Sequence, residues 1–229
     1  MCLKPKLKCS DGIFNLFIKN KEVKTPEQVS FNFKDKTLPN LILEEIKKFK
    51  LKNLNQSIYY NIFSLAKDKV LINKQKYIEE VMKYINTDLI CYWENKPDDL
   101  YNLQLDNWNS QLKKLKKEEL NFDYTFNITP IKQNKSSIVL LKKKLIQLDD
   151  IILSCLLIIT KITSSVLLSY LFITNRIKPI DLYNNTYLHE IWQSKKWGIV
   201  EEEKEKREND VLIFKKIYKL IKIKYEKQN

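Results

Sequence analysis

The spacing of apolar residues near the amino terminus is that of β-strands. Within residues 12–33, apolar side chains recur at every second position, first at Phe14, Leu16 and Ile18 and then at Val29, Phe31 and Phe33. This alternation is typical of strands that bury one face. Asn20-Lys21 lies between the two runs and predicts a hairpin turn, because asparagine tolerates a positive φ. We therefore expect a small β-rich region at the start of the chain.

The spacing changes to a helical one from about residue 38 onward. Apolar residues then recur three and four positions apart, which predicts helices over residues 38–50, 58–70, 75–85, 137–148 and 201–225. Pro97 and Pro179 are suited to the first turns of two further helices. The predicted fold class is α+β, with a small amino-terminal β-rich region that includes one helix (residues 1–50), followed by a larger α-helical bundle (residues 51–229).

Residues 151–173 form the most apolar run in the chain. The run is long enough to span a bilayer. Lys161 lies near its centre, however, where a charge is costly in lipid, and several serines and threonines add polarity. We predict a buried helix or helix pair and no transmembrane segment.

The composition excludes several classes of enzyme. With two glycines in 229 residues, the chain has no glycine-rich phosphate loop or dinucleotide fingerprint. One histidine and four cysteines without a CxxC pair cannot form a zinc cluster, and their spacing indicates a reducing compartment. Cys91 is a conceivable nucleophile, but only His189 could act as its base, so we predict a small buried thiol instead. We expect no catalytic residue, no metal and no cofactor.

The formal net charge of +13 raises the possibility of a nucleic-acid partner. Only Arg176 and Arg207 among the 41 basic residues are arginines, although arginine is the usual residue for bidentate recognition of phosphates and bases. A solvated lysine surface is therefore the preferred interpretation. The alternative is a basic helical protein associated with RNA or the ribosome, which would use Lys113, Lys114, Lys116 and Lys117 together with residues 142–144.

Residues 187–203 combine apolar anchors with acids in this otherwise basic chain. Leu188 and Trp192 share one face of a predicted helix, and Trp197 precedes Gly198, a residue that commonly ends helices. Glu201 to Glu203 would lie in the first turn of the next helix, where the helix dipole favours negative charge. Two aromatic anchors within a polar rim suit a protein-binding surface, although both tryptophans could equally lie in the core.

This stretch resembles a family of ATP synthase assembly chaperones that act on the alpha subunit of the catalytic (F-one) sector. The matching residues are Leu188, Glu190, Trp192, Gln193, Trp197, Gly198 and Glu201. Further matches follow in order along almost the whole chain, at residues 24–26 (Lys-Thr-Pro), 68–70 (Asp-Lys-Val), 87–92 (Thr-Asp-Leu-Ile-Cys-Tyr), Gln104 with Trp108, and Ser164 with Ser165.

The resemblance implies a non-enzymatic chaperone that holds the unassembled alpha subunit until the beta subunit replaces it. It implies no nucleic-acid partner, and we expect a monomer when the protein is free. Family members work in the cytoplasm of alpha-proteobacteria or in the mitochondrial matrix, and the short amino terminus favours the cytoplasm. The expected client-binding residues are Glu190, Trp192, Gln193, Trp197, Gly198 and Glu201.

Overall fold

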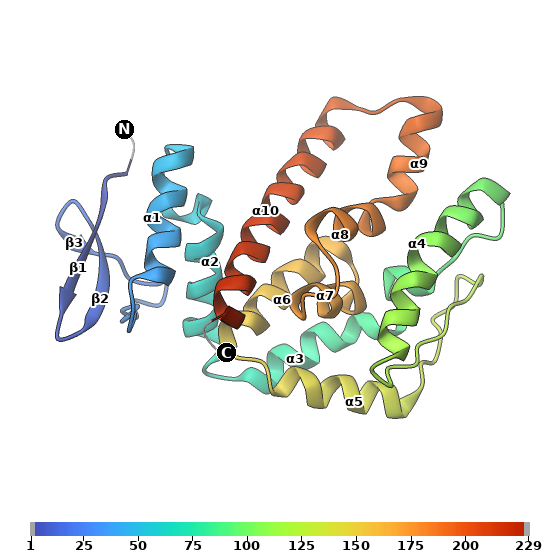
Figure 1. Cartoon of the computed structure of the whole chain (residues 1–229), viewed down its shortest axis with the longest axis horizontal. Coiled ribbons are helices and arrows are strands. Elements are labelled where there is room, and N and C mark those ends of the chain that lie inside the picture. The colour runs from blue at the N-terminus through green and yellow to red at the C-terminus, as the bar shows by residue number, and fades with distance from the viewer. Residues whose placement is uncertain (1–2, 227–229) are drawn as a thin grey trace. The chain divides into compact units, whose positions relative to one another are not determined.

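The structure, a computed structural model, describes residues 3–226 and forms two compact units (Figure 1). Among the described residues, one unit comprises residues 3–74 together with 149–154, and the other comprises residues 75–148 and 155–226. The compact units thus divide after Lys74, whereas the domains predicted from sequence divide after residue 50. The predicted α+β fold class is confirmed, because a small sheet precedes a larger set of helices.

The sheet of the first unit is antiparallel with the strand order β1 (Pro5–Ser10), β2 (Ile13–Ile18), β3 (Lys21–Glu22). Asp11 and Gly12 join β1 to β2, and Lys19 and Asn20 join β2 to β3; all four have positive φ. Two-residue turns of this kind follow the right-handed twist of paired strands. The second turn therefore lies one residue before the predicted Asn20-Lys21. Strand β1 was not predicted, because Leu7 is its only large apolar side chain and the alternation with Lys6 and Lys8 is therefore a weak signal.

The helices of the first unit pack on apolar residues from the sheet and the segment after it. They are α1 (Thr37–Phe49), the short η1 (Leu54–Gln56), α2 (Ile58–Leu65) and the π-helical turn η2 (Ala66–Val70). Phe33 packs edge-on against Phe63 of α2, with ring centroids 5.3 Å apart. Thr25 of the Lys-Thr-Pro stretch is buried, and its hydroxyl accepts a hydrogen bond from the Val29 N–H. That stretch is thus a structural turn.

The second unit is helical and is built around α7, every residue of which is buried. Helices α4, α8 and α10 all contact α7. The helices in chain order from residue 74 are α3 (Lys74–Met82), η3 (Lys83–Asn86), η4 (Leu89–Cys91), α4 (Asp98–Lys116), α5 (Lys135–Ile146), α6 (Asp150–Thr163), α7 (Val166–Ile173), α8 (Pro179–Thr186), α9 (Leu188–Trp197) and α10 (Glu201–Glu226).

The most apolar run of the sequence forms the helix pair α6 and α7, as predicted. Ser164 has a φ of 52° between the two helices, and the Ser165 hydroxyl caps α7 by accepting from the Leu168 N–H. Lys161 reaches solvent and pairs with Glu80 at 3.3 Å. Across residues 3–226, none of the helices combines the length and apolar character that crossing a membrane requires.

Candidate functional site

The helix predicted from Pro179 is divided in two at Tyr187. Pro179 is the first residue of α8, and the Asp181 carboxylate accepts a hydrogen bond from the Lys178 N–H at 3.0 Å. Tyr187 leaves helical geometry with a φ of −104° and a ψ of 24°, and its buried hydroxyl donates to Asp210 of α10. Helix α9 begins at the next residue and so takes a direction of its own (Figure 1).

Helix α9 is held to the start of α4 by one carboxylate. The Trp192 Nε1–H donates to Asp99 Oδ2 at 3.0 Å, and the Lys196 ammonium lies 2.8 Å from the same oxygen and 4.2 Å from the centroid of the Trp192 ring. The hydrogen bond from Lys196 is the main cause that lowers the pKa of the Asp99 carboxylate, and the hydrogen bond from Trp192 lowers it further. Trp192 is only 9% exposed, so its main contribution is to position α9.

An apolar surface lies where α9 turns into α10. Trp197 is 72% exposed and meets Trp192 edge-on, with ring centroids 5.4 Å apart. Ile199 and Val200 follow it and are 42% and 66% exposed. We call Trp197, Ile199 and Val200 the turn surface. One of the two tryptophans that the sequence left undecided is therefore a packing residue, and the other faces solvent.

Gly198 makes this turn possible. Its φ of 86° and ψ of 176° fall in a region that is essentially restricted to glycine, and its N–H closes α9 by donating to the Ser194 carbonyl at 3.0 Å. Glu201 lies in the first turn of α10, as predicted, and pairs with Lys204 at 3.0 Å. Glu190 is half-buried and Gln193 exposed on α9. The six predicted client-binding residues thus occupy one segment of the surface, and their contact with a client stays a prediction.

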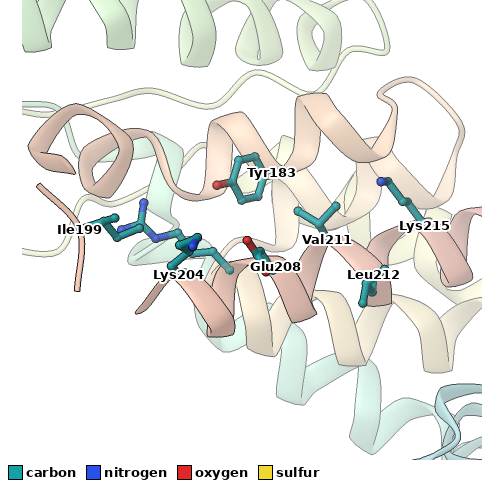
Figure 2. A pocket seen from close by; sticks show the side chains of 8 residues that line it. Tyr183, Ile199, Lys204, Glu208, Val211, Leu212 and Lys215 are labelled. Atoms are coloured by element: carbon teal, nitrogen blue, oxygen red, sulfur yellow. The ribbon is translucent and has the colours of Figure 1, made fainter. Parts of the chain in front are cut away.

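A groove that sequence reasoning did not find begins at the turn surface. It has a volume of about 370 Å³ and lies between Tyr183 of α8 and one side of α10 (Figure 2). Its lining residues are Tyr183, Ile199, Lys204, Arg207, Glu208, Val211, Leu212 and Lys215. No local pattern could have indicated it, because it depends on α8 packing beside α10.

Arg207 fastens the groove to α9. It is buried, and its Nη2 donates to the Ser194 hydroxyl at 2.9 Å and to Glu203 at 3.2 Å. Glu203 and Arg207 are four residues apart on α10, a spacing that brings side chains together on one face, and they form an ion pair. A guanidinium can satisfy two such partners at once, which a lysine ammonium would do less rigidly.

The single histidine, His189, takes part in the contacts that hold α9 to α4. The Gln104 side-chain oxygen accepts from the Glu94 N–H at 2.9 Å, so its amide nitrogen donates to His189 Nε2 at 2.6 Å. Burial lowers the pKa of His189, which favours the neutral ring that this bond needs. The indole N–H of Trp108 donates to the Asn185 carbonyl at 2.9 Å. Gln104 and Trp108 therefore hold α8 and α9 in place.

The Thr87–Tyr92 segment is likewise structural. Asp88 is fully buried and accepts from the Ser165 hydroxyl at 2.6 Å and from the Leu167 N–H at 3.0 Å, so that it caps α7. Burial raises the pKa of Asp88 to about 7, and these hydrogen bonds act in the opposite direction. Cys91 is a buried thiol, as predicted. Burial raises the pKa of this thiol well above its ordinary value.

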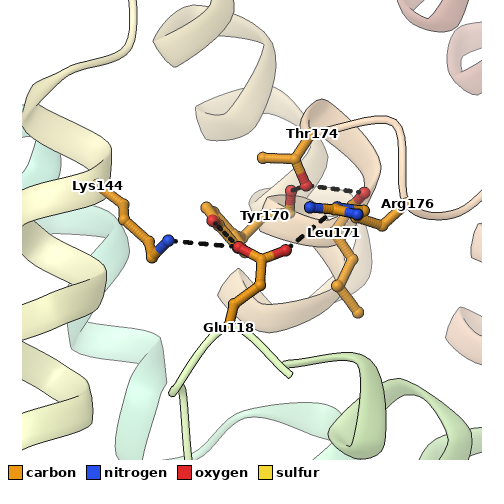
Figure 3. A network of polar contacts seen from close by, with 6 residues as sticks. All are labelled: Glu118, Lys144, Tyr170, Leu171, Thr174 and Arg176. Carbon is orange, nitrogen blue, oxygen red and sulfur yellow. Dashed lines mark hydrogen bonds and ion pairs between the residues drawn. The ribbon is translucent and has the colours of Figure 1, made fainter. Parts of the chain in front are cut away.

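One lysine of the alternative RNA-binding interpretation, Lys144, pairs with the carboxylate of Glu118 (Figure 3). Glu118 accepts from the Tyr170 hydroxyl at 2.7 Å and pairs with Arg176 at 3.2 Å and with Lys144 at 3.4 Å. These bonds tie the end of α4 to α5 and α7, which gives Lys144 and Arg176 a structural role. Lys114 and Lys117 line an adjoining hollow of about 320 Å³.

An exposed apolar turn held in place by buried hydrogen bonds is a candidate protein-binding surface. The ATP12 chaperone protein family matches residues 4–116. The fold resembles the crystal structure of Atp12 from Paracoccus denitrificans, with a TM-score of 0.81, 18% identity and 96% of each chain covered. It also resembles a candidate chaperone from Agrobacterium tumefaciens, with a TM-score of 0.85, 20% identity, and 95% of this chain and 83% of that one covered.

No curated protein sequence matches the chain significantly. The match of the ATP12 chaperone family to residues 4–116 confirms the sequence resemblance to the ATP synthase assembly chaperones over that part of the chain. The family match ends at residue 116, and at identities of 18% and 20% the two structures show the shared fold alone. The role of the α9–α10 turn must therefore be argued from its own geometry.

Proposed function

We propose that the chain is a non-enzymatic assembly chaperone that binds the unassembled ATP synthase alpha subunit and releases it to the beta subunit. The observation that carries this proposal is the turn surface. Trp197, Ile199 and Val200 expose contiguous apolar side chains on a turn whose position is set by buried contacts of Trp192 and Arg207. A rigid apolar projection with a polar rim is suited to covering an apolar client interface.

The size of this surface suits temporary binding. Burying about 150 Å² of the Trp197 side chain would contribute roughly 4 kcal/mol at about 25 cal/mol per Å². Association and the ordering of side chains cost at least as much. The turn surface alone therefore gives weak, reversible binding, which a larger interface with the beta subunit can displace.

The six predicted residues take different parts in this proposal. Trp197 is the anchor, and Trp192 and Gly198 hold it in place. Glu190, Gln193 and Glu201 form the polar rim, which disfavours non-specific association of the apolar turn. The proposed partner is the alpha subunit, with no nucleic acid and no transmembrane segment. The proposed setting is the bacterial cytoplasm or, alternatively, the mitochondrial matrix.

Co-expression with the cognate alpha subunit tests the proposal. The wild-type chain is expected to keep alpha soluble, to co-purify with it and to be displaced by added beta. Trp197→Ser should reduce capture at least about tenfold, because it removes the anchor. Ile128→Ser is the matched control, since Ile128 is 98% exposed and lies outside the turn surface. Equal capture by both variants would refute the turn surface as the binding site.

Glu190→Lys tests the polar rim in the same assay. Glu190 is half-buried without being part of the core, so the variant should keep the wild-type melting temperature. Capture should weaken, because the reversal changes the charge beside the anchor. A well-folded Glu190→Lys variant that captures alpha normally would remove Glu190 from the proposed site.

A further inference from the structure

The groove beside α10 has the dimensions of a helix-binding site. Its lining residues on α10 run from Lys204 through Glu208 and Leu212 to Lys215, at roughly one residue per turn. At 1.5 Å per residue this stripe is about 16 Å long, which equals about three helical turns. The opposite wall is formed by Tyr183 of α8 (Figure 2).

The groove continues the turn surface. Ile199 belongs to both, since it is exposed at the turn and lines the groove. Val211 and Leu212 extend the apolar surface along α10, and Leu212 is 43% exposed. Along the groove, Lys204, Arg207 and Glu208 lie between Ile199 and Val211. A client segment that meets Trp197 would therefore pass charged side chains before it reaches Leu212.

The end of the groove at Lys215 favours an acidic group. Three cations, Lys204, Arg207 and Lys215, line it against the single acid Glu208. Arg207 is engaged by Glu203, and Lys204 by Glu201. Lys215 forms no ion pair within the described part of the chain, so its charge is available to a partner at the far end of the groove.

We propose that this groove receives an amphipathic helix of the client, about three turns long, whose apolar stripe lies on Val211 and Leu212 and whose acidic residue pairs with Lys215. This inference rests on the proposed function, in which the client is the ATP synthase alpha subunit. A helix fits better than a strand, because the lining consists of side chains, all but Ile199 from α8 and α10, and no β-strand lies among the lining residues.

Two substitutions test the groove separately from the turn surface. Leu212→Asp should weaken capture of co-expressed alpha subunit at least about tenfold, and Lys215→Glu should weaken it about threefold to tenfold at low salt. The matched controls are Leu71→Asp, at an exposed leucine in the first unit, and Lys113→Glu, at an exposed lysine on α4. Neither control should change capture, and all four variants should melt near the wild-type temperature.

Crosslinking identifies the occupant. A photo-reactive p-benzoylphenylalanine in place of Leu212 is expected to crosslink to an alpha-subunit peptide that is predicted to be helical, apolar on one face and acidic at one end. The groove inference is overturned if the Leu212 and Lys215 variants capture alpha like wild type while Trp197→Ser does not; the proposed function then stands. It is also overturned if the crosslinked peptide is basic or extended. Failure of the wild-type chain to bind alpha would overturn both proposals.

Discussion

At the scale of single residues, the motifs that carry the family resemblance are mostly structural. Thr25 stabilises a turn, Asp88 caps α7, and Gln104 with Trp108 supports α8 and α9. Each of these side chains is buried and makes a hydrogen bond whose loss would leave a polar partner unsatisfied, at a cost of about 1–3 kcal/mol. The motifs therefore report on the fold, and exposed residues such as Trp197 are better candidates for client contact.

His189 provides a pH-dependent test at this scale. Burial lowers the pKa of His189, and the negative charges of Glu190 and Glu94 raise it by a smaller amount. The native state therefore binds a proton at His189 less readily than the unfolded chain does. The contribution of neutral His189 to the free energy of unfolding is therefore present above pH 6.5 and is lost as the pH falls through that value. NMR titration of this single histidine should give a pKa below 6.5.

The stability of His189→Gln serves as the control for that titration. Burial raises the pKa of Asp88 to about 7, so protonation of Asp88 stabilises the native state as the pH falls. This effect is opposite in sign to that of His189 over part of the same pH range. The difference between wild type and His189→Gln isolates the histidine. A measured pKa at or above 6.5 would show that the Gln104 amide does not donate to a neutral ring.

At the scale of elements, the turn between α9 and α10 depends on two sets of side-chain contacts and on one backbone conformation. Trp192 and Lys196 bind Asp99 of α4, Arg207 binds Ser194, and Gly198 adopts a conformation that other residues avoid. The first two fix the helices, and the third sets the direction in which Trp197 and Val200 project. We infer that the turn surface is preorganised, which reduces the entropic cost of binding.

Gly198→Ala tests the importance of that backbone conformation. No atom lies within 4 Å of the added methyl group, so the effect comes from the positive φ alone. The free energy of unfolding should fall by about 1–3 kcal/mol, and client capture should weaken as the turn relaxes. Gly12→Ala is a matched control, because Gly12 has a φ of 74° with equally open surroundings in the β1–β2 turn. It should lose comparable stability in a denaturant titration but retain capture.

At the scale of the whole molecule, the net charge of +13 does not by itself define a nucleic-acid site. Lys144 and Arg176 are engaged by Glu118, and Lys161 by Glu80. The remaining lysines increase solubility and attract anions over the length scale of salt screening, about 8–10 Å at physiological ionic strength. The apolar turn surface, by contrast, should be little affected by salt.

The two candidate functions therefore differ in salt dependence. Capture of the alpha subunit should persist at about 0.5 M NaCl with only the modest loss that Lys215 contributes, because apolar burial dominates. Binding to RNA through the lysines of α4 and α5 would fall steeply and linearly in a double-logarithmic plot against salt concentration. RNA that co-purifies with such a slope, in the absence of alpha-subunit capture, would favour the basic binding protein instead.

The sequence alone determined the regular elements and the position of the candidate site. Helical periodicity, Pro179 and the Trp197-Gly198 pair are local signals, and they correctly predicted most helices, the helix pair over residues 151–173 and the acidic start of α10. Strand β1 was missed because a single large apolar side chain, Leu7, gives too weak an alternation.

Only the tertiary structure decided which tryptophan is exposed and that a groove adjoins it. Trp192 is covered because Asp99, 93 residues earlier, accepts its indole N–H, and the groove exists because α8 packs beside α10. Such contacts depend on how distant segments are brought together during folding. Local periodicity identifies the apolar face of a helix, but it does not identify the segment that will cover that face.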